Sequence, residues 1–150
     1  MFRQIVLPTD GSEGVGQAIQ AAVAVAEKFD ARVHVLFVAE PPRFHEYGAS
    51  VALTNIMQSL QEAGRQILDD TAERIRNKGL ASVETALRQG HPAEEIIGYA
   101  EENGADLIVM GTHGRRGINR MLLGSVTEEV VRCSHVPIMT VRMTSSESAE

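Results

Sequence analysis

The chain has 150 residues, of which 43% are hydrophobic, 23% charged and 4% aromatic, a composition typical of one globular domain. A chain of this length can bury roughly two-thirds of the surface that it exposes when unfolded. Its formal charge of −6, from 14 Lys and Arg against 20 Asp and Glu, argues against general binding to nucleic acid or to an anionic membrane. Any anionic ligand must therefore be held by local groups.

The single cysteine, Cys133, cannot form an intrachain disulfide, and residues 1–3 lack the basic-then-apolar order of a signal peptide. No apolar run approaches the roughly 20 residues that a membrane-spanning helix needs. These features predict a cytoplasmic protein with no membrane contact. Cys133 is expected on the inner side of the last predicted helix, as a small core residue.

Short apolar runs alternate with longer segments of helical period, an order typical of a parallel sheet covered by helices. Ser12 is the predicted N-cap of the first helix, Pro92 lies in the first turn of the third, and Asn103-Gly104 ends that helix. In chain order we expect a strand at 5–7, a helix at 12–29, a strand at 33–38, a helix at 54–77, an alternating strand at 83–87, a helix from 92, a strand at 107–110, a helix at 126–132 and a strand at 138–141.

The first and fourth strands are the ones expected at the centre of the sheet, because central parallel strands read as continuously apolar and edge strands can alternate. This places the strands in the order 3-2-1-4-5, a Rossmann-like, doubly wound α/β fold with helices on both faces. The chain connection then reverses between strands 1 and 4. Ligands bind at such a switch point, beyond the carboxyl ends of the strands.

Residues 1–143 are predicted to form a single domain, and residues 144–150 have the small, polar composition of a flexible tail. A long connection, residues 39–53, leaves the same edge of the sheet as the candidate site. Two interpretations of it are open: a cover that closes over a ligand, or a surface loop with no such role.

The segment from Gly111 to Ser125 carries the candidate binding groups. Glycines at 111, 114, 117 and 124 let the backbone approach a ligand and turn its N–H groups outward as anion donors. Ser125-Val126-Thr127-Glu128 fits a capping box, which would start the last helix at Ser125 and add a second group of N–H donors. The alternative is that Ser125 only caps its helix and that the glycines only turn the chain.

Charged side chains near this segment have two interpretations each. Asp10, at the end of the first strand, can accept hydrogen bonds from ribose hydroxyls or hold Mg²⁺, or it can simply form a turn before Gly11. His113 can donate to phosphate or merely be solvated. Glu128 and Glu129 would oppose a phosphate, and Arg115, Arg116 or a divalent cation could offset them.

Several known signatures are absent from the sequence. Gly124-Ser125 lacks the glycine spacing and the lysine of a Walker sequence, and the glycines after Asp10 lack the dinucleotide spacing. The other four histidines are scattered without metal-ligand spacing: His34, His45, His91 and His135. P-loop and classical NAD chemistry are therefore unsupported, and no metal site is predicted.

Residues 3–142 resemble the universal stress protein family, from Ile5-Val-Leu-Pro-Thr-Asp-Gly-Ser through Asp106-Leu-Ile-Val-Met-Gly-Thr-His-Gly-Arg to Val136-Pro-Ile. The most specific element is the family's nucleotide motif: Gly, two residues, Gly, nine residues, then Gly and Ser or Thr. It is matched without a gap by Gly111, Gly114, Gly124 and Ser125. The chain thus resembles the branch of the family that keeps these glycines and binds ATP.

The resemblance implies a role for each matching position. Asp10, in one loop with Pro8 and Thr9, would contact the ribose, Val38 would lie against the adenine, and Met110 and Gly111 would flank the sugar. The phosphates would be held by Gly114, Gly124, Ser125 and Val126, with His113, Arg115 and Thr127 as neighbours. None of these residues is a recognised catalytic base.

The resemblance also implies a homodimer through strand 5, and Ile138, Met139, Thr140 and Val141 are too apolar for an uncovered edge strand. The expected function is a regulatory stress-response module that binds ATP, or ADP or AMP, with or without Mg²⁺, and acts on an unknown protein partner. Two alternatives stay open. One is a slow ATP hydrolase or nucleotidyl-transferring enzyme that uses the same pocket, and the other is a dimeric scaffold that binds no nucleotide.

Overall fold

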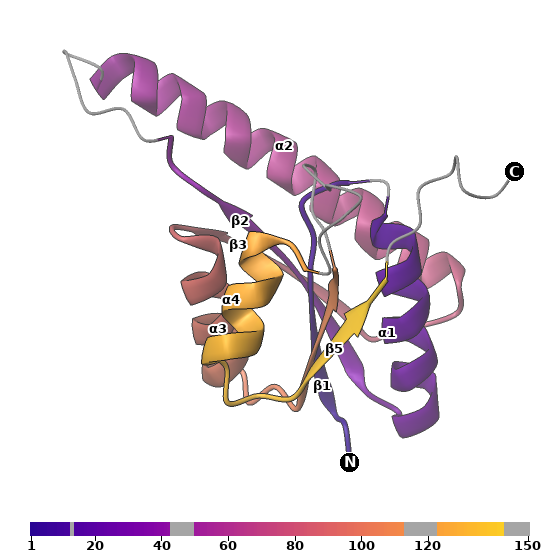
Figure 1. The fold of residues 1–150 in the computed structure, drawn as a ribbon. Coiled ribbons are helices and arrows are strands. Elements are labelled where there is room, and N and C mark those ends of the chain that lie inside the picture. The colour runs from indigo at the N-terminus through magenta and orange to yellow at the C-terminus, as the bar shows by residue number, and fades with distance from the viewer. Residues whose placement is uncertain (13, 43–49, 113–122, 143–150) are drawn as a thin grey trace, which may run out of the picture.

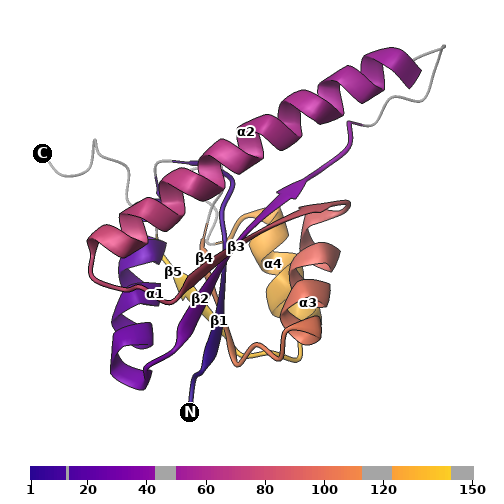
Figure 2. The ribbon, with the colours of Figure 1, turned by 180° about the vertical axis from the view of Figure 1, so that it is seen from behind.

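The computed structural model describes residues 1–12, 14–42, 50–112 and 123–142, and strands and helices alternate through these ranges (Figures 1 and 2). Their bounds follow the predicted elements closely, apart from the helix starts discussed below. In chain order they are β1 (Gln4–Pro8), α1 (Val15–Phe29), β2 (Arg32–Ala39), α2 (Ser50–Asn77), β3 (Val83–Gln89), α3 (Pro92–Glu102), β4 (Leu107–Gly111), α4 (Ser125–Cys133) and β5 (Ile138–Val141).

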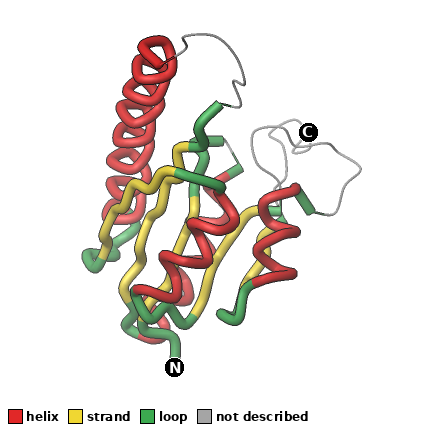
Figure 3. Tube along the Cα trace, turned by 90° about the vertical axis from the view of Figure 1, so that its left-hand side faces the viewer, coloured by secondary structure: helices red, strands yellow, loops and turns green. Residues whose placement is uncertain are grey.

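The five strands form one parallel sheet in the order β3-β2-β1-β4-β5. At its centre, Val6 of β1 lies between His34 of β2 and Ile108 of β4. Helices α1 and α2 cover one face, and α3 and α4 cover the other (Figure 3). The predicted doubly wound fold and its strand order are confirmed.

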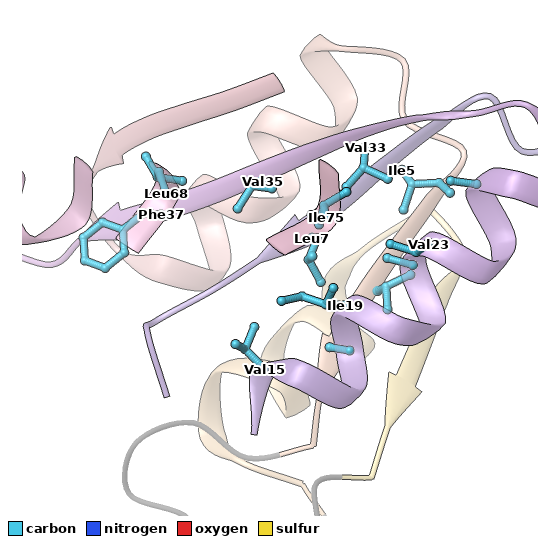
Figure 4. Close-up of a cluster of buried hydrophobic side chains, with 14 of the residues drawn as sticks. Ile5, Leu7, Val15, Ile19, Val23, Val33, Val35, Phe37, Leu68 and Ile75 are labelled. Carbon is cyan, nitrogen blue, oxygen red and sulfur yellow. The ribbon is translucent and has the colours of Figure 1, made fainter. Parts of the chain in front are cut away.

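Alternating side chains of the central strand β1 pack into two separate hydrophobic cores. Ile5 and Leu7 point toward α1 and α2, whereas Val6 points toward α3 and α4, and none of the three exposes any surface. The larger core also takes Ile19 of α1 and Ile75 of α2 (Figure 4). A strand buried on both faces needs apolar residues in succession, which is why β1 reads as a continuous apolar run.

Helix α2 lies unusually close to the sheet. A Cβ atom on Gly64 would stand 2.5 Å from Phe37 Cδ1 and 2.8 Å from Leu87 Cδ1, so only glycine fits at this contact. With 28 residues the helix is about 42 Å long, whereas the eight residues of β2 span only about 26 Å. Its N-terminal part consequently extends past the sheet (Figure 1).

Two predicted helix starts are wrong. Helix α1 begins at Val15 with Gly14 in the N-cap position, not at Ser12, because Ser12 belongs to a turn closed by Asp10. Helix α2 begins at Ser50 rather than at residue 54, which shortens the connection after β2. Residues 43–49 of that connection and residues 144–150 of the predicted tail lie outside the described ranges.

A buried polar group joins α3 to the sheet. His34 is 3% exposed, its Nδ1 lies 2.9 Å from the Tyr99 hydroxyl, and its Nε2 lies 2.7 Å from Gln4 Oε1. Since Gln4 Oε1 can only accept, Nε2 carries the proton and Nδ1 accepts from Tyr99. Burial lowers the pKa of His34, which favours this neutral form.

Two further expectations concern the surface. Cys133, expected in the core, is exposed, because it is the last residue of α4 and lies beyond the helix's packed stripe. Among the described helices, none combines the length and apolarity needed to cross a bilayer.

Candidate functional site

The candidate site lies where β1 and β4 end. The two strands run parallel and pair through Ile5 with Leu107 and Val6 with Ile108, so Pro8 and Gly111 end at the same edge of the sheet. The chain continues from them as the loop at 9–14 and as Thr112, while α4 starts nearby. The switch point predicted from the sequence is thus present.

The loop after β1 is a hydrogen-bonded turn. The Thr9 amide donates to the Leu36 carbonyl at 2.9 Å, and Thr9 Oγ1 accepts from the Gly11 amide at 3.2 Å. Asp10 Oδ1 accepts from the Ser12 amide at 2.9 Å, and Gly11 adopts a φ of +81°, which glycine tolerates best. Asp10 therefore takes part in a turn, and the turn holds its carboxylate at the end of β1.

The start of α4 differs from the predicted capping box. Gly124, not Ser125, occupies the N-cap position with extended backbone (φ −72°, ψ 165°), and no side chain caps the helix. The Gly124 carbonyl accepts the Glu128 amide at 2.9 Å, which makes Ser125 the first helical residue. The exposed Ser125 hydroxyl is consequently not used for capping.

The first three backbone amides of α4 are those of Ser125, Val126 and Thr127. The Glu128 amide is the first to find an acceptor within the helix, and the first amides of any helix lack such partners. No acceptor for the three amides lies among the residues that the structure describes. Together with the positive end of the helix dipole, they form a group of donors suited to an anion.

Hydrogen bonds tie this helix end to the sheet. Buried Thr127 donates its hydroxyl to the Gly111 carbonyl at 2.9 Å, and the Gly124 amide donates to the Thr112 carbonyl at 2.5 Å. The Thr112 amide in turn donates to the Val141 carbonyl of β5 at 2.9 Å. The start of α4 is therefore positioned by the end of β4, and the Thr127 hydroxyl is engaged with Gly111.

The apolar residues of the predicted site lie on one face of the sheet. Met110 is buried in the core under α3 and α4, and Val38 and Val126 pack against the same core while remaining partly exposed. Val38 lies two positions beyond the partner of Pro8 in β2, and therefore near the carboxyl edge. The structure thus brings the apolar candidates to the face that carries α4.

Both acidic side chains predicted to oppose a phosphate have basic partners. Glu128 lies 3.4 Å from Arg132 one turn further along α4, and Glu129 Oε2 lies 2.8 Å from His91 Nε2 at the start of α3. The hydrogen bond to Glu129 is the main cause that raises the pKa of His91. Sequence reasoning set His91 aside as isolated, although its place after β3 puts it at the same edge of the sheet.

Three predicted site residues, His113, Gly114 and Arg115, lie outside the described ranges, and their roles remain predictions. The other predicted site residues lie at the carboxyl edge of the sheet or at the start of α4, and their roles also stay predictions: Pro8, Thr9, Asp10, Val38, Met110, Gly111, Gly124, Ser125, Val126 and Thr127. No group of three or more metal-binding side chains occurs in the described part of the chain.

This architecture defines a doubly wound α/β protein in which a turn follows β1, and the N-terminus of α4 is joined to the end of β4 at the same edge of the sheet. The model of the universal stress protein family matches residues 1–142, and the chain belongs to that family.

Relatives and solved structures agree with this assignment. The universal stress protein MJ0531 of Methanocaldococcus jannaschii is 36% identical, over 98% of this chain and 86% of the relative, and YxiE of Bacillus subtilis is 32% identical, over 95% and 100%. The solved structure of MJ0577, from M. jannaschii, has a TM-score of 0.85 at 29% identity, covering 97% and 99% of the two chains. A universal stress protein solved in complex with cAMP has a TM-score of 0.70 at 25% identity, covering 95% and 98%.

Proposed function

We propose that this chain is a regulatory module that binds ATP at the switch point and acts as a homodimer. The observation that carries the proposal is the group of three amides at the start of α4, for which the described chain supplies no acceptor. Backbone amides at a helix end are donors well suited to phosphate oxygens. Their position beside the ends of β1 and β4 is where ligands of doubly wound sheets bind.

The remaining groups fit the other parts of a nucleotide. Val38 and Val126 present apolar surface on the α4 face, against which an adenine ring can lie. Asp10 stands at the end of β1, within the same edge, and its carboxylate suits the ribose hydroxyls. The matched glycine motif of the family would add Gly114 to the phosphate contacts and place Gly111 beside the sugar.

The comparison with solved structures supports an adenine nucleotide as the ligand, because the similar universal stress protein noted above was crystallised with cAMP. ATP, rather than ADP or AMP, is proposed from the glycine motif, and Mg²⁺ would offset the charge of a triphosphate. We infer that occupancy of the site changes the surface around it and so regulates binding of a protein partner in the cytoplasm.

The proposed dimer forms through β5. This strand pairs with β4 on one side and is the last strand of the described sheet on the other, while 36% of the surface of Met139 is exposed. Pairing with a second copy would cover Met139 and give hydrogen-bond partners to the backbone groups on the outer edge of β5.

Replacing Gly124 with valine tests the nucleotide site. The backbone of Gly124 is extended and open to any residue, so the fold should persist, while the added side chain obstructs phosphate at the amides. We expect ATP affinity, measured by calorimetry on nucleotide-stripped protein, to fall by about tenfold or more.

Gly98→Val in α3 is the matched control, because a Cβ at Gly98 meets no atom within 4 Å. It should bind ATP as the unmodified protein does. If the stripped, unmodified protein binds no adenine nucleotide, or if Gly124→Val binds ATP normally, the site is not the one proposed here. The first result would instead favour a nucleotide-free scaffold.

A further inference from the structure

One side-chain contact links the proposed phosphate site to a titratable group on another element. Glu129 lies one helical turn after Ser125, about 6 Å along the helix axis from the first amide. Its Oε2 is 2.8 Å from Nε2 of His91, the residue before α3. The function proposed above makes no use of this contact.

We propose that His91 is a protonation-dependent counter-charge for the phosphate-binding end of α4. As an imidazolium it neutralises Glu129, and as a neutral imidazole it leaves the Glu129 carboxylate to repel a bound phosphate. This inference rests on the proposed function, because it concerns the same site. This rise along the axis is shorter than the screening length of about 8 Å at physiological salt, so a carboxylate in the first turns of α4 would repel a phosphate at the amides.

The backbone fixes His91 in this position. His91 is the N-cap residue of α3 and has extended backbone (φ −76°, ψ 121°). Its carbonyl accepts a hydrogen bond from the Glu95 amide at 3.0 Å. Gly90 before it has a φ of +148°, and Pro92 after it restricts the chain further. The imidazole is therefore presented to α4 by a constrained turn.

Three acidic side chains of the described residues act on the charge of His91. Glu129 approaches from α4, Glu94 from α3 and Glu40 from the end of β2, and all three raise the pKa of His91 above its ordinary value of 6.5. The hydrogen bond with Glu129 contributes most. The imidazolium therefore persists to a higher pH than in a free histidine and is lost as the pH rises further.

Glu128 does not share this behaviour. Its partner is the guanidinium of Arg132, at 3.4 Å, which stays charged throughout the accessible pH range. Any dependence of phosphate affinity on pH that comes from the acidic side chains of α4 thus passes through Glu129 and His91.

A double-mutant cycle with ADP as the probe tests the inference. Calorimetry measures the ADP affinity of four proteins: the wild type, His91→Gln, Glu129→Gln and the double variant. The titrations are made at constant ionic strength from about pH 6 to about pH 9, a range that includes the ordinary pKa of histidine. Protonation of ADP itself affects all four proteins equally and cancels in the affinity ratios.

We expect the wild type to bind ADP roughly threefold more tightly than His91→Gln at the acidic end, with the ratio falling to one at the alkaline end. Glu129→Gln should bind ADP more tightly than the wild type at the alkaline end. In the Glu129→Gln background, the effect of His91→Gln on ADP affinity should be smaller than in the wild-type background. His135→Gln, at an exposed histidine after α4, is the control and should match the wild type at every pH.

The outcomes separate the two proposals. A wild-type to His91→Gln ratio that is the same at every pH, or an undiminished effect of His91→Gln in the Glu129→Gln background, would overturn the role of His91 and leave the nucleotide site standing. If the wild type does not bind ADP, the cycle is repeated with ATP, and failure to bind either nucleotide at any pH would overturn both.

Discussion

Thr127 shows how a single hydroxyl can position a binding site without contacting its ligand. Its Oγ1 donates to the Gly111 carbonyl at 2.9 Å, and its side chain is 4% exposed. The bond joins the last residue of β4 to the first turn of α4, where the three amides lie. The direction of those amides therefore depends on this contact.

Thr127→Val removes the donor while keeping the shape of the side chain. We expect the free energy of unfolding, measured by urea denaturation, to fall by about 1 kcal/mol, because the Gly111 carbonyl loses a buried donor. ADP affinity should fall as well, since the amides are less firmly held.

Thr127→Ser keeps the hydroxyl and is the matched control, so it should retain more ADP affinity than Thr127→Val. If the two variants bind ADP equally well, the hydroxyl has no positioning role.

At the level of single residues, the sequence predicted which positions lie at the carboxyl edge of the sheet, but not the local conformation that each adopts there. Gly124 and Ser125 are both acceptable N-caps, and only the backbone conformation shows that Gly124 takes the role. The structure shows the turn at Asp10 that the sequence offered as one interpretation, while a contact of Asp10 with ribose stays a proposal. The contact of His91 with Glu129 was not predictable, because it depends on how α3 and α4 pack.

Among the helices, α3 is anchored to the sheet by the pairing of Tyr99 with His34. The hydroxyl and Nδ1 are 2.9 Å apart, and the two rings meet edge to face with centroids 5.7 Å apart. Because Tyr99 supplies the only donor that the described residues give to Nδ1, its hydroxyl fixes the relation of α3 to β2.

Tyr99→Phe tests this anchor at the scale of the helix. The variant keeps the ring but leaves Nδ1 of His34 buried without a donor, which should cost about 1 to 3 kcal/mol in the free energy of unfolding at neutral pH. Chemical denaturation followed by circular dichroism measures it.

Acidification adds a second readout for this pair. The lowered pKa of His34 means that the unfolded chain takes up a proton more readily than the folded protein, so the stability that His34 confers should fall as the pH drops below about 6.5. A Tyr99→Phe protein as stable as the wild type at neutral pH would show that α3 is held by its apolar face alone.

The succession of elements was readable because each has its own hydrophobic period, and all the strands were predicted in their places. The start of α2 was missed because residues 50–53 follow a proline-rich, glycine-containing connection that reads as a loop. The close approach at Gly64 was also hidden, since a glycine inside a helical pattern does not tell which neighbour occupies the vacant space.

On the scale of the whole molecule, the proposed dimer can be tested at the two edges of the sheet. Met139→Lys places a charge on the exposed side of β5 and should shift the protein toward the monomer in sedimentation velocity. Thr85→Lys, on the exposed part of the opposite edge strand β3, is the control and should leave the assembly unchanged. Dissociation by Thr85→Lys, with Met139→Lys unaffected, would move the interface to β3.

The central position of β1 has a consequence for biosynthesis. Asp106 accepts hydrogen bonds from the amides of Arg3 and Gln4, at 2.6 and 2.9 Å, across 103 and 102 positions of the chain. On the ribosome, β1 can pair with β2 early, yet its other edge waits until β4 has been translated. A nascent chain that ends before residue 107 therefore carries an apolar strand with one uncovered side, open to a chaperone or to a neighbouring nascent chain.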